Sequence, residues 1–118
     1  MKTQAFTLHT DRQGYYNITA AVKKCVSDAS VRSGLCVVFC PHTTAAITIN
    51  ENADPDVRHD LVLGMDGAFP IRSGFLHGEG NSDAHLKCMN VGASETILIE
   101  EGRLLLGTWQ AVYFAEFD

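Results

Sequence analysis

The spacing of hydrophobic residues along this chain predicts a mixture of helices and strands. Between Ile18 and Ala29 the apolar positions recur with the helical period, so an amphipathic helix is expected there. Asn17 or Thr19 can cap the start of this helix, and Ser33-Gly34 can end it. Two more helices are expected further along the chain.

The second helix is expected to begin at Asp54-Pro55, because aspartate can cap a helix start. Proline suits the first helical position, since the backbone N–H that it lacks would have no acceptor within the helix there. The third is expected from Asn81-Ser82 to about Asn90, with Gly92 as its stop. Between them lies a glycine-rich, irregular segment long enough to be functional. The apolar stripes of the two helices are Val57, Leu61 and Met65 in the second, and Leu86 and Met89 in the third.

Strands are expected where apolar residues alternate at every second position. Residues 2–9 alternate weakly, and Tyr15-Tyr16 begins a second extended piece. Residues 35–40 are apolar on both faces, as in a central strand that is covered on both sides, and residues 45–50 resume the alternation. These patterns predict several short strands in the first half of the chain.

The last part of the chain predicts a hairpin and a long strand. Residues 96–100 and 103–106 flank Glu101-Gly102, which is a tight-turn signal. A bend is expected at Gly107-Thr108. The strand that follows has one apolar face, formed by Trp109, Ala111, Tyr113, Ala115 and Phe117.

Length and charge limit the possible classes of protein. A chain of 118 residues with 46% hydrophobic and 19% charged residues is expected to form a single globular domain over residues 1–118. The formal net charge of −5 argues against nucleic acid as a partner. Without an apolar signal region or a stretch of membrane-spanning length, a cytoplasmic location and no membrane contact are expected.

Four cysteines are present, and none of them forms a C-x-x-C pair. In a reducing compartment they are expected to be free thiols, mostly buried. Cys36 and Cys40 would share one face of a strand, which leaves a zinc or redox role open as the alternative.

Two histidines lie in polar stretches that favour a metal site. His42 and His85 can ligate a divalent cation, with Glu51, Asp54 and Asp83 competing to supply a carboxylate. The alternative for each histidine is a hydrogen-bonded structural role. Glu51, Asp54 and Asp56 together can hold magnesium, although capping and pairing with the helix dipole explain the two aspartates equally well.

The run from Gly78 to Asp83 leads into the third expected helix. Free N–H groups at a helix start, together with the helix dipole, favour a phosphate or carboxylate. The alternative is a glycine-rich connection that Asn81 or Ser82 caps, with Lys87 nearby but solvated. The same dipole disfavours the protonated form of His85, whereas Asp83 favours it.

Some aromatic residues and histidines have a structural explanation as well. Trp109 and Tyr113 can cover the ring of a ligand, but an apolar strand face is more often part of a core. The remaining histidines, His9, His59 and His77, are expected on the surface.

Four sequence blocks, read together, resemble the YjbQ family. They begin at His42, Asn50, Gly80 and Gly102, and they read HTTAA, NENADPDV, GNSDAHLK and GRLLLGTWQ. The blocks occur in the order of the family, and their combination is far more specific than any one of them. The resemblance implies an α+β fold with a largely antiparallel β-sheet and two to three helices packed on it, in a homotrimer with sites close to the subunit boundaries.

The resemblance also implies an activity. Members of the family resemble thiamine-phosphate synthases, transferases that join hydroxymethylpyrimidine diphosphate to thiazole phosphate and release pyrophosphate, here as a main or a side activity. The competing hypotheses are a trimeric module that binds a phosphorylated metabolite without turnover, and a metal-dependent hydrolase. The expected metal is divalent, zinc or magnesium.

These hypotheses assign roles to particular side chains. The expected catalytic residues are His42, His85 and Glu51, and the expected metal ligands are the same three together with Asp54. The remaining expected contacts to a phosphorylated ligand are Asn81, Ser82, Asp83, Lys87 and, flanking a ring, Trp109.

One departure from the family pattern concerns the end of the sequence. The family usually continues past Glu-Phe-Asp into Gly-Pro-Arg and a further strand, whereas this sequence stops at Asp118. An arginine that neutralises phosphate and a strand that closes the sheet would both lie in that segment. This departure therefore puts in question both the expected catalysis, which would use that arginine, and the expected closure of the sheet by that strand.

Overall fold

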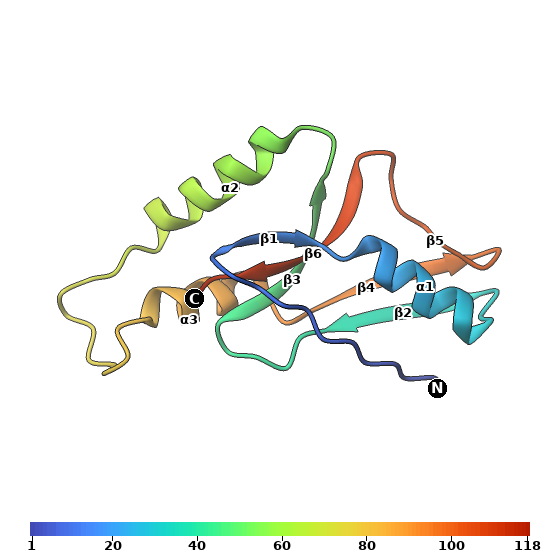
Figure 1. The fold of residues 1–118 in the computed structure, drawn as a ribbon, viewed down its shortest axis with the longest axis horizontal. Helices are drawn as coiled ribbons and strands as arrows, with labels where there is room; N and C mark the ends of the chain where they lie inside the picture. The colour runs from blue at the N-terminus through green and yellow to red at the C-terminus, as the bar shows by residue number, and fades with distance from the viewer.

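The computed structural model describes residues 1–118 and contains three helices and six strands (Figure 1). No helix combines the length and the apolar character needed to cross a membrane. The elements in chain order are β1 (Gly14–Asn17), α1 (Thr19–Ala29), β2 (Gly34–Phe39), β3 (Ala45–Glu51), α2 (Pro55–Ala68), α3 (Ser82–Val91), β4 (Ser94–Glu100), β5 (Arg103–Leu104) and β6 (Gln110–Glu116).

The strands form two antiparallel sheets, in the orders β1-β6-β3 and β2-β4-β5. The longest pairing joins β3 to β6, from Ala45 opposite Glu116 to Glu51 opposite Gln110. Glu101 and Gly102 both have positive φ, 51° and 78°, and form the expected tight turn between β4 and β5. The α+β class and the antiparallel pairing are therefore confirmed.

The sheets are held by two apolar clusters. In the larger one, Ile18, which precedes α1, and Val22 and Val26 of α1 pack with residues of both sheets, among them Ile47 and Ile97. The smaller cluster lies between α3 and the β3–β6 pair, where small side chains allow the helix to approach the sheet closely. Its buried members are Ala46, Ala84, Cys88, Ala115 and Phe117.

The N-terminal segment is not a strand, contrary to the expectation for residues 2–9. It is extended but pairs with no strand. Its side chains instead reach α1, where the Lys2 ammonium donates to the carbonyl of Ala29 and the Gln4 amide donates to the carbonyl of Cys25 (3.1 Å). The weak alternation predicted an extended backbone correctly but not a partner for its hydrogen bonds.

Strand β2 lies at an edge of its sheet, which corrects the expectation of a central strand covered on both sides. Its only neighbour is β4, and α1 covers one face only. On the other face Leu35, Val37 and Phe39 are 63%, 61% and 64% exposed. The apolar run therefore indicated a strand correctly, but within one chain nothing covers its second face.

Three expected details of the helices and of β6 are also corrected. Helix α1 ends before Ser30, which has a left-handed backbone (φ 55°), rather than at Ser33-Gly34. Met89, expected in the core, is 73% exposed because α3 packs through Ala84 and Cys88 instead. Trp109 is 61% exposed because it precedes β6, whereas the other apolar positions of that strand face are buried.

All four cysteines are free thiols, as expected. Cys40 and Cys88 are buried, whereas Cys25 and Cys36 are half-buried. Burial raises the pKa of the Cys36 and Cys40 thiols, so both stay protonated near neutral pH.

Lys87 is buried (1% exposed), which corrects the expectation that it is solvated. Its ammonium lies 2.5 Å from the Asp66 carboxylate and 3.6 Å from that of Asp83. Asp66 also accepts from the Gln13 side chain (2.9 Å). A buried cation needs such partners, and these contacts join α3 to α2 and to the segment before β1.

Helix α2 has no fully buried residue, so these polar contacts add to the packing of its half-buried Met65 against the smaller cluster. Figure 1 shows it standing apart from the sheets, with a long loop leading back to α3. Its start is as expected, since the Asp54 side chain accepts from the Asp56 N–H (2.9 Å) and Pro55 occupies the first turn. The hydrogen bonds to Lys87 and Gln13 hold the pKa of Asp66 below its usual value.

Replacing Ile47 with alanine should lower the free energy of unfolding by about 2–5 kcal/mol, because it removes methyl groups from the larger cluster. Ile47 is only 2% exposed. The matched control is Ile71→Ala, at a residue that is 66% exposed, where a change within about 0.5 kcal/mol is expected. Chemical denaturation measures both, and equal effects of the two substitutions would contradict the packing described.

The contact between Asp66 and Lys87 should make stability depend on pH. Because the folded pKa of Asp66 is lowered, its contribution is fully present above the unfolded value of about 3.9 and is lost as the pH falls through the folded value. The stability lost in Asp66→Asn should therefore be largest at neutral pH and shrink in acid. Denaturation from pH 7 to pH 3, with Glu79→Gln as control, tests this, and a difference independent of pH would contradict it.

Candidate functional site

The expected site residues lie in two groups at opposite ends of β3. His42 lies in the loop before this strand, and Glu51 is its last residue. Seven residues of extended backbone place the two ends of β3 about 20 Å apart. The structure therefore divides the residues that the sequence suggested as a single site.

The first group surrounds the beginning of α3. The ring of His85 meets the ring of His77 edge to face, with centroids 5.4 Å apart. The chain at His42 lies beside the same helix, since its carbonyl oxygen is 3.7 Å from the thiol of Cys88, three residues after His85. His42 is exposed and His85 is half-buried, so both rings have access to solvent.

Asn81 precedes α3 and has one unused acceptor. Its amide nitrogen donates to the carboxylate of Asp118 (2.9 Å), whereas its Oδ1 is buried without a hydrogen-bond partner. A buried acceptor of this kind calls for a donor. Asn81 therefore suits an N–H or O–H group of a ligand better than a fully ionised phosphate.

The other polar residues at this helix start are Ser82, Asp83 and Lys87. Ser82 and Asp83 form the first turn of α3, where backbone N–H groups have no partner within the helix. The ammonium of Lys87 forms salt bridges with the carboxylates of Asp66 and Asp83, so it is not available as an unpaired cation at the helix start. The fixed positive character here is thus limited to that of the helix dipole.

The second group lies at the other end of β3. The carbonyl of Glu51 accepts from the hydroxyl of Tyr113 (2.9 Å), and the Arg58 guanidinium lies 5.9 Å from the centre of the Tyr113 ring. Asp54 is occupied as the cap of α2, and the Trp109 carbonyl accepts from the N–H of Asn52 (2.9 Å). Burial raises the pKa of Tyr113, so its hydroxyl remains a donor at neutral pH.

The residues of one chain do not fit a metal site. No three side chains of histidine, cysteine, aspartate or glutamate converge. His42 and His85 are separated from Glu51 and Asp54 by the length of β3. The divalent metal stays a prediction that requires donors beyond those a single chain brings together.

Two groups of residues beside the expected ones were missed from the sequence. His77 was expected only on the surface, yet its ring contacts His85. Arg58 and Tyr113 meet beside Glu51 although they belong to different elements. The glycines after His77 were the only feature of the local sequence that pointed to the contact between His77 and His85. The contact between Arg58 and Tyr113 depends wholly on the fold.

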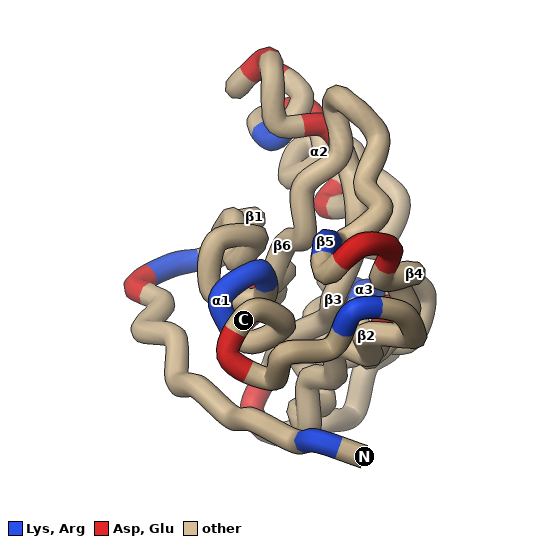
Figure 2. Tube along the Cα trace, turned by 90° about the vertical axis from the view of Figure 1, so that its right-hand side faces the viewer, with Lys and Arg blue, Asp and Glu red and all other residues tan.

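Figure 2 shows the basic residues scattered along the trace rather than gathered into one stripe.

Comparison with known proteins identifies the relatives of this chain. The family model described as UPF0047 protein YjbQ-like matches residues 4–118. A UPF0047 protein of Methanocaldococcus jannaschii is 50% identical over 91% of this chain and 78% of its own length. YugU of Bacillus subtilis, also a UPF0047 protein, is 47% identical over 92% of this chain and 83% of its own.

Solved structures agree with this relationship. A YjbQ/UPF0047 protein from Clostridium acetobutylicum, described as uncharacterized, has 53% identity and a TM-score of 0.91, covering 94% of this chain and 87% of that one. A hypothetical protein from Aeropyrum pernix has 36% identity and a TM-score of 0.94, covering 100% and 90%. By its sequence and by its fold, this chain belongs to the YjbQ (UPF0047) family.

Proposed function

We propose that this chain is a transferase of the thiamine-phosphate synthase type, with its site at the beginning of α3. The observation that carries the proposal is the meeting of the His85 and His77 rings beside this helix start, with the His42 chain next to the same helix. Imidazole and backbone N–H groups are suitable donors for a leaving phosphate.

The reaction requires stabilisation of a leaving group more than it requires a nucleophile from the protein. The bond between the pyrimidine methylene carbon and the diphosphate oxygen breaks, and the diphosphate leaves with the electron pair. The thiazole nitrogen then donates its electron pair to form the new C–N bond. His85 and the N–H groups of Ser82 and Asp83 would donate to the diphosphate, while Asn81 Oδ1 would accept from the pyrimidine amino group.

Neither Lys87 nor a metal contacts the substrates in the proposed reaction. Lys87 is buried against carboxylates. The donors of a single chain do not converge on a metal, so a metal-dependent hydrolase would need ligands from another copy of the chain. Glu51 and Trp109 lie at the far end of β3, and they could act only across a boundary with another copy of the chain.

A binding module without turnover is the second candidate, and one observation favours it. Two carboxylates lie at the same helix start, since Asp118 contacts Asn81 and Asp83 is in the first turn. Negative charge there opposes the build-up of charge on a leaving diphosphate. Such a site would hold a phosphorylated metabolite weakly without promoting bond cleavage.

A homotrimer is the proposed assembly, and the uncovered face of β2 supports it. Leu35, Val37 and Phe39 share this face with Leu98 of β4, which is 55% exposed and lies opposite Leu35. Monomeric proteins rarely expose a contiguous patch of large apolar side chains. Contact between copies of the chain through this face would remove the patch from water.

Turnover should depend on His85 and His42 if the first candidate is right. With hydroxymethylpyrimidine diphosphate and thiazole phosphate, His85→Ala and His42→Ala should each lower the rate of pyrophosphate release by about 100-fold, the scale of one acid–base or donor group. His59→Ala is the control, because His59 is exposed on α2 and its side chain hydrogen-bonds to the neighbouring Asp60 rather than to a residue of α3. Binding without pyrophosphate release by the unmodified protein would instead support the non-catalytic module.

Association should depend on the uncovered face of β2. Val37→Glu places a charge on this face and should convert a trimer to a monomer, a threefold drop in the mass measured by sedimentation equilibrium. Leu76→Glu is the matched control, since Leu76 is 97% exposed in the loop before α3. An unmodified chain that sediments as a monomer, or a trimer that Val37→Glu leaves intact, would contradict the proposal.

A further inference from the structure

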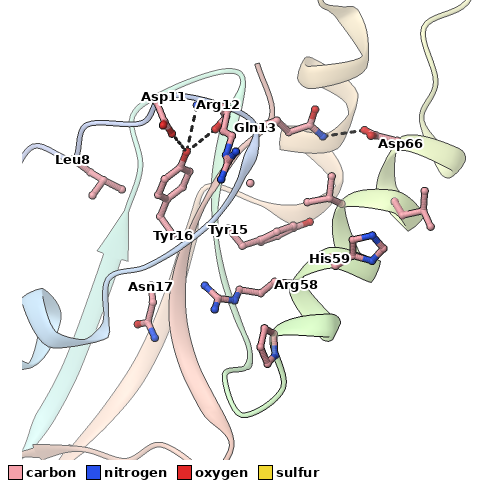
Figure 3. A pocket seen from close by; sticks show the side chains of 14 residues that line it. Leu8, Asp11, Arg12, Gln13, Tyr15, Tyr16, Asn17, Arg58, His59 and Asp66 are labelled. Atoms are coloured by element: carbon pink, nitrogen blue, oxygen red, sulfur yellow. Dashed lines mark hydrogen bonds between the residues drawn. The ribbon is translucent and has the colours of Figure 1, made fainter.

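A cleft of about 740 Å³ lies between β1 and α2, away from the start of α3 (Figure 3). Its walls come from residues 11–17 on one side and from α2 on the other. This volume is typical of sites for small molecules. None of the α2 residues that line the cleft is fully buried.

Of the two carboxylates that line this cleft, Asp66 is paired with a cation, whereas Asp11 is hydrogen-bonded but keeps its charge. The carboxylate of Asp11 accepts from the hydroxyl of Tyr16 (3.0 Å). Asp66 accepts from Lys87 and from Gln13. His59, the remaining titratable group of α2 in the cleft, lies against the neighbouring Asp60.

The arginines of the cleft are not paired. Arg12 and Arg58 both line it, and neither guanidinium forms a salt bridge within the chain. In a chain with a formal net charge of −5, the two guanidinium groups outnumber Asp11, the one carboxylate of the cleft without a cationic partner, and this gives the cleft a local positive character. Guanidinium groups bind phosphate and carboxylate through paired hydrogen bonds, so this charge favours an anion.

The cleft also has an aromatic wall that is held in place. The ring of Tyr15 meets the edges of Tyr113 and Phe117, with centroids 6.5 Å and 6.2 Å apart. Figure 3 shows Tyr15 extending from β1 toward α2 and Arg58 extending from α2 toward β1. Arg58 in turn lies over the ring of Tyr113, which fixes the position of this cation.

We propose that the cleft between β1 and α2 binds a small metabolite that carries an anionic group on a flat ring. The ring would pack on Tyr15, and the phosphate or carboxylate would be held by Arg58 and Arg12. This site is separate from the one at the start of α3 and uses none of its residues. A family relative in which Tyr15, Arg58 and Arg12 are replaced would lose the site in the cleft and keep the site at the start of α3.

Titration of the 15N-labelled full-length chain by NMR tests the site with phenyl phosphate, benzoate and inorganic phosphate as probes. Phenyl phosphate or benzoate should shift the amide signals of residues 14–17 in a saturable way, and whichever binds more tightly identifies the preferred anion. Inorganic phosphate should bind at least tenfold more weakly, because it lacks the ring. Arg58→Gln should weaken binding of the preferred probe about tenfold or more, as expected for loss of one charge-assisted contact.

The matched control is Arg72→Gln, because Arg72 is exposed in the loop before α3, does not line the cleft and forms no salt bridge. It should bind the probe as the unmodified chain does. Absence of saturable shifts in residues 14–17 with either ring compound, or equal affinity in Arg58→Gln, would overturn the proposal. Shifts confined to α3 would overturn it as well, while leaving the proposed transferase site untouched.

Discussion

The pairing of β3 with β6 is the constraint on which the rest of the molecule depends. Seven matched positions fix which residues face each side, so Ile47 and Val112 meet α1 while Ala46 and Ala115 meet α3. A shift of one residue would exchange the two sets and expose both clusters. The same strand also sets the separation between the two ends at which polar residues gather.

Packing and polar contacts hold different parts of this structure. Helix α1 is held by apolar burial against both sheets, whereas α2 has no fully buried residue and is held by the partly buried Met65 and by the contact of Asp66 with the buried Lys87. An element with little buried apolar surface contributes little to global stability and can move at small cost. The cleft that α2 lines therefore lies where the fold tolerates the adjustment that binding requires.

The two proposed sites use different physical means to attract an anion. At the start of α3 the positive character comes from backbone N–H groups and histidines, and nearby carboxylates oppose it. In the cleft it comes from guanidinium groups that form no salt bridge.

Local signals in the sequence determined most of the elements: the capped start of α2 at Asp54-Pro55, the end of α3 at Gly92, and the turn at Glu101-Gly102. They also identified the family, through blocks of residues that lie far apart. Only the tertiary structure decided which faces are covered and which polar residues meet, because these depend on strand partners at long range. For this reason β2 proved to be an edge strand, Lys87 proved to be buried, and His42 and Glu51 proved to lie at opposite ends of one strand.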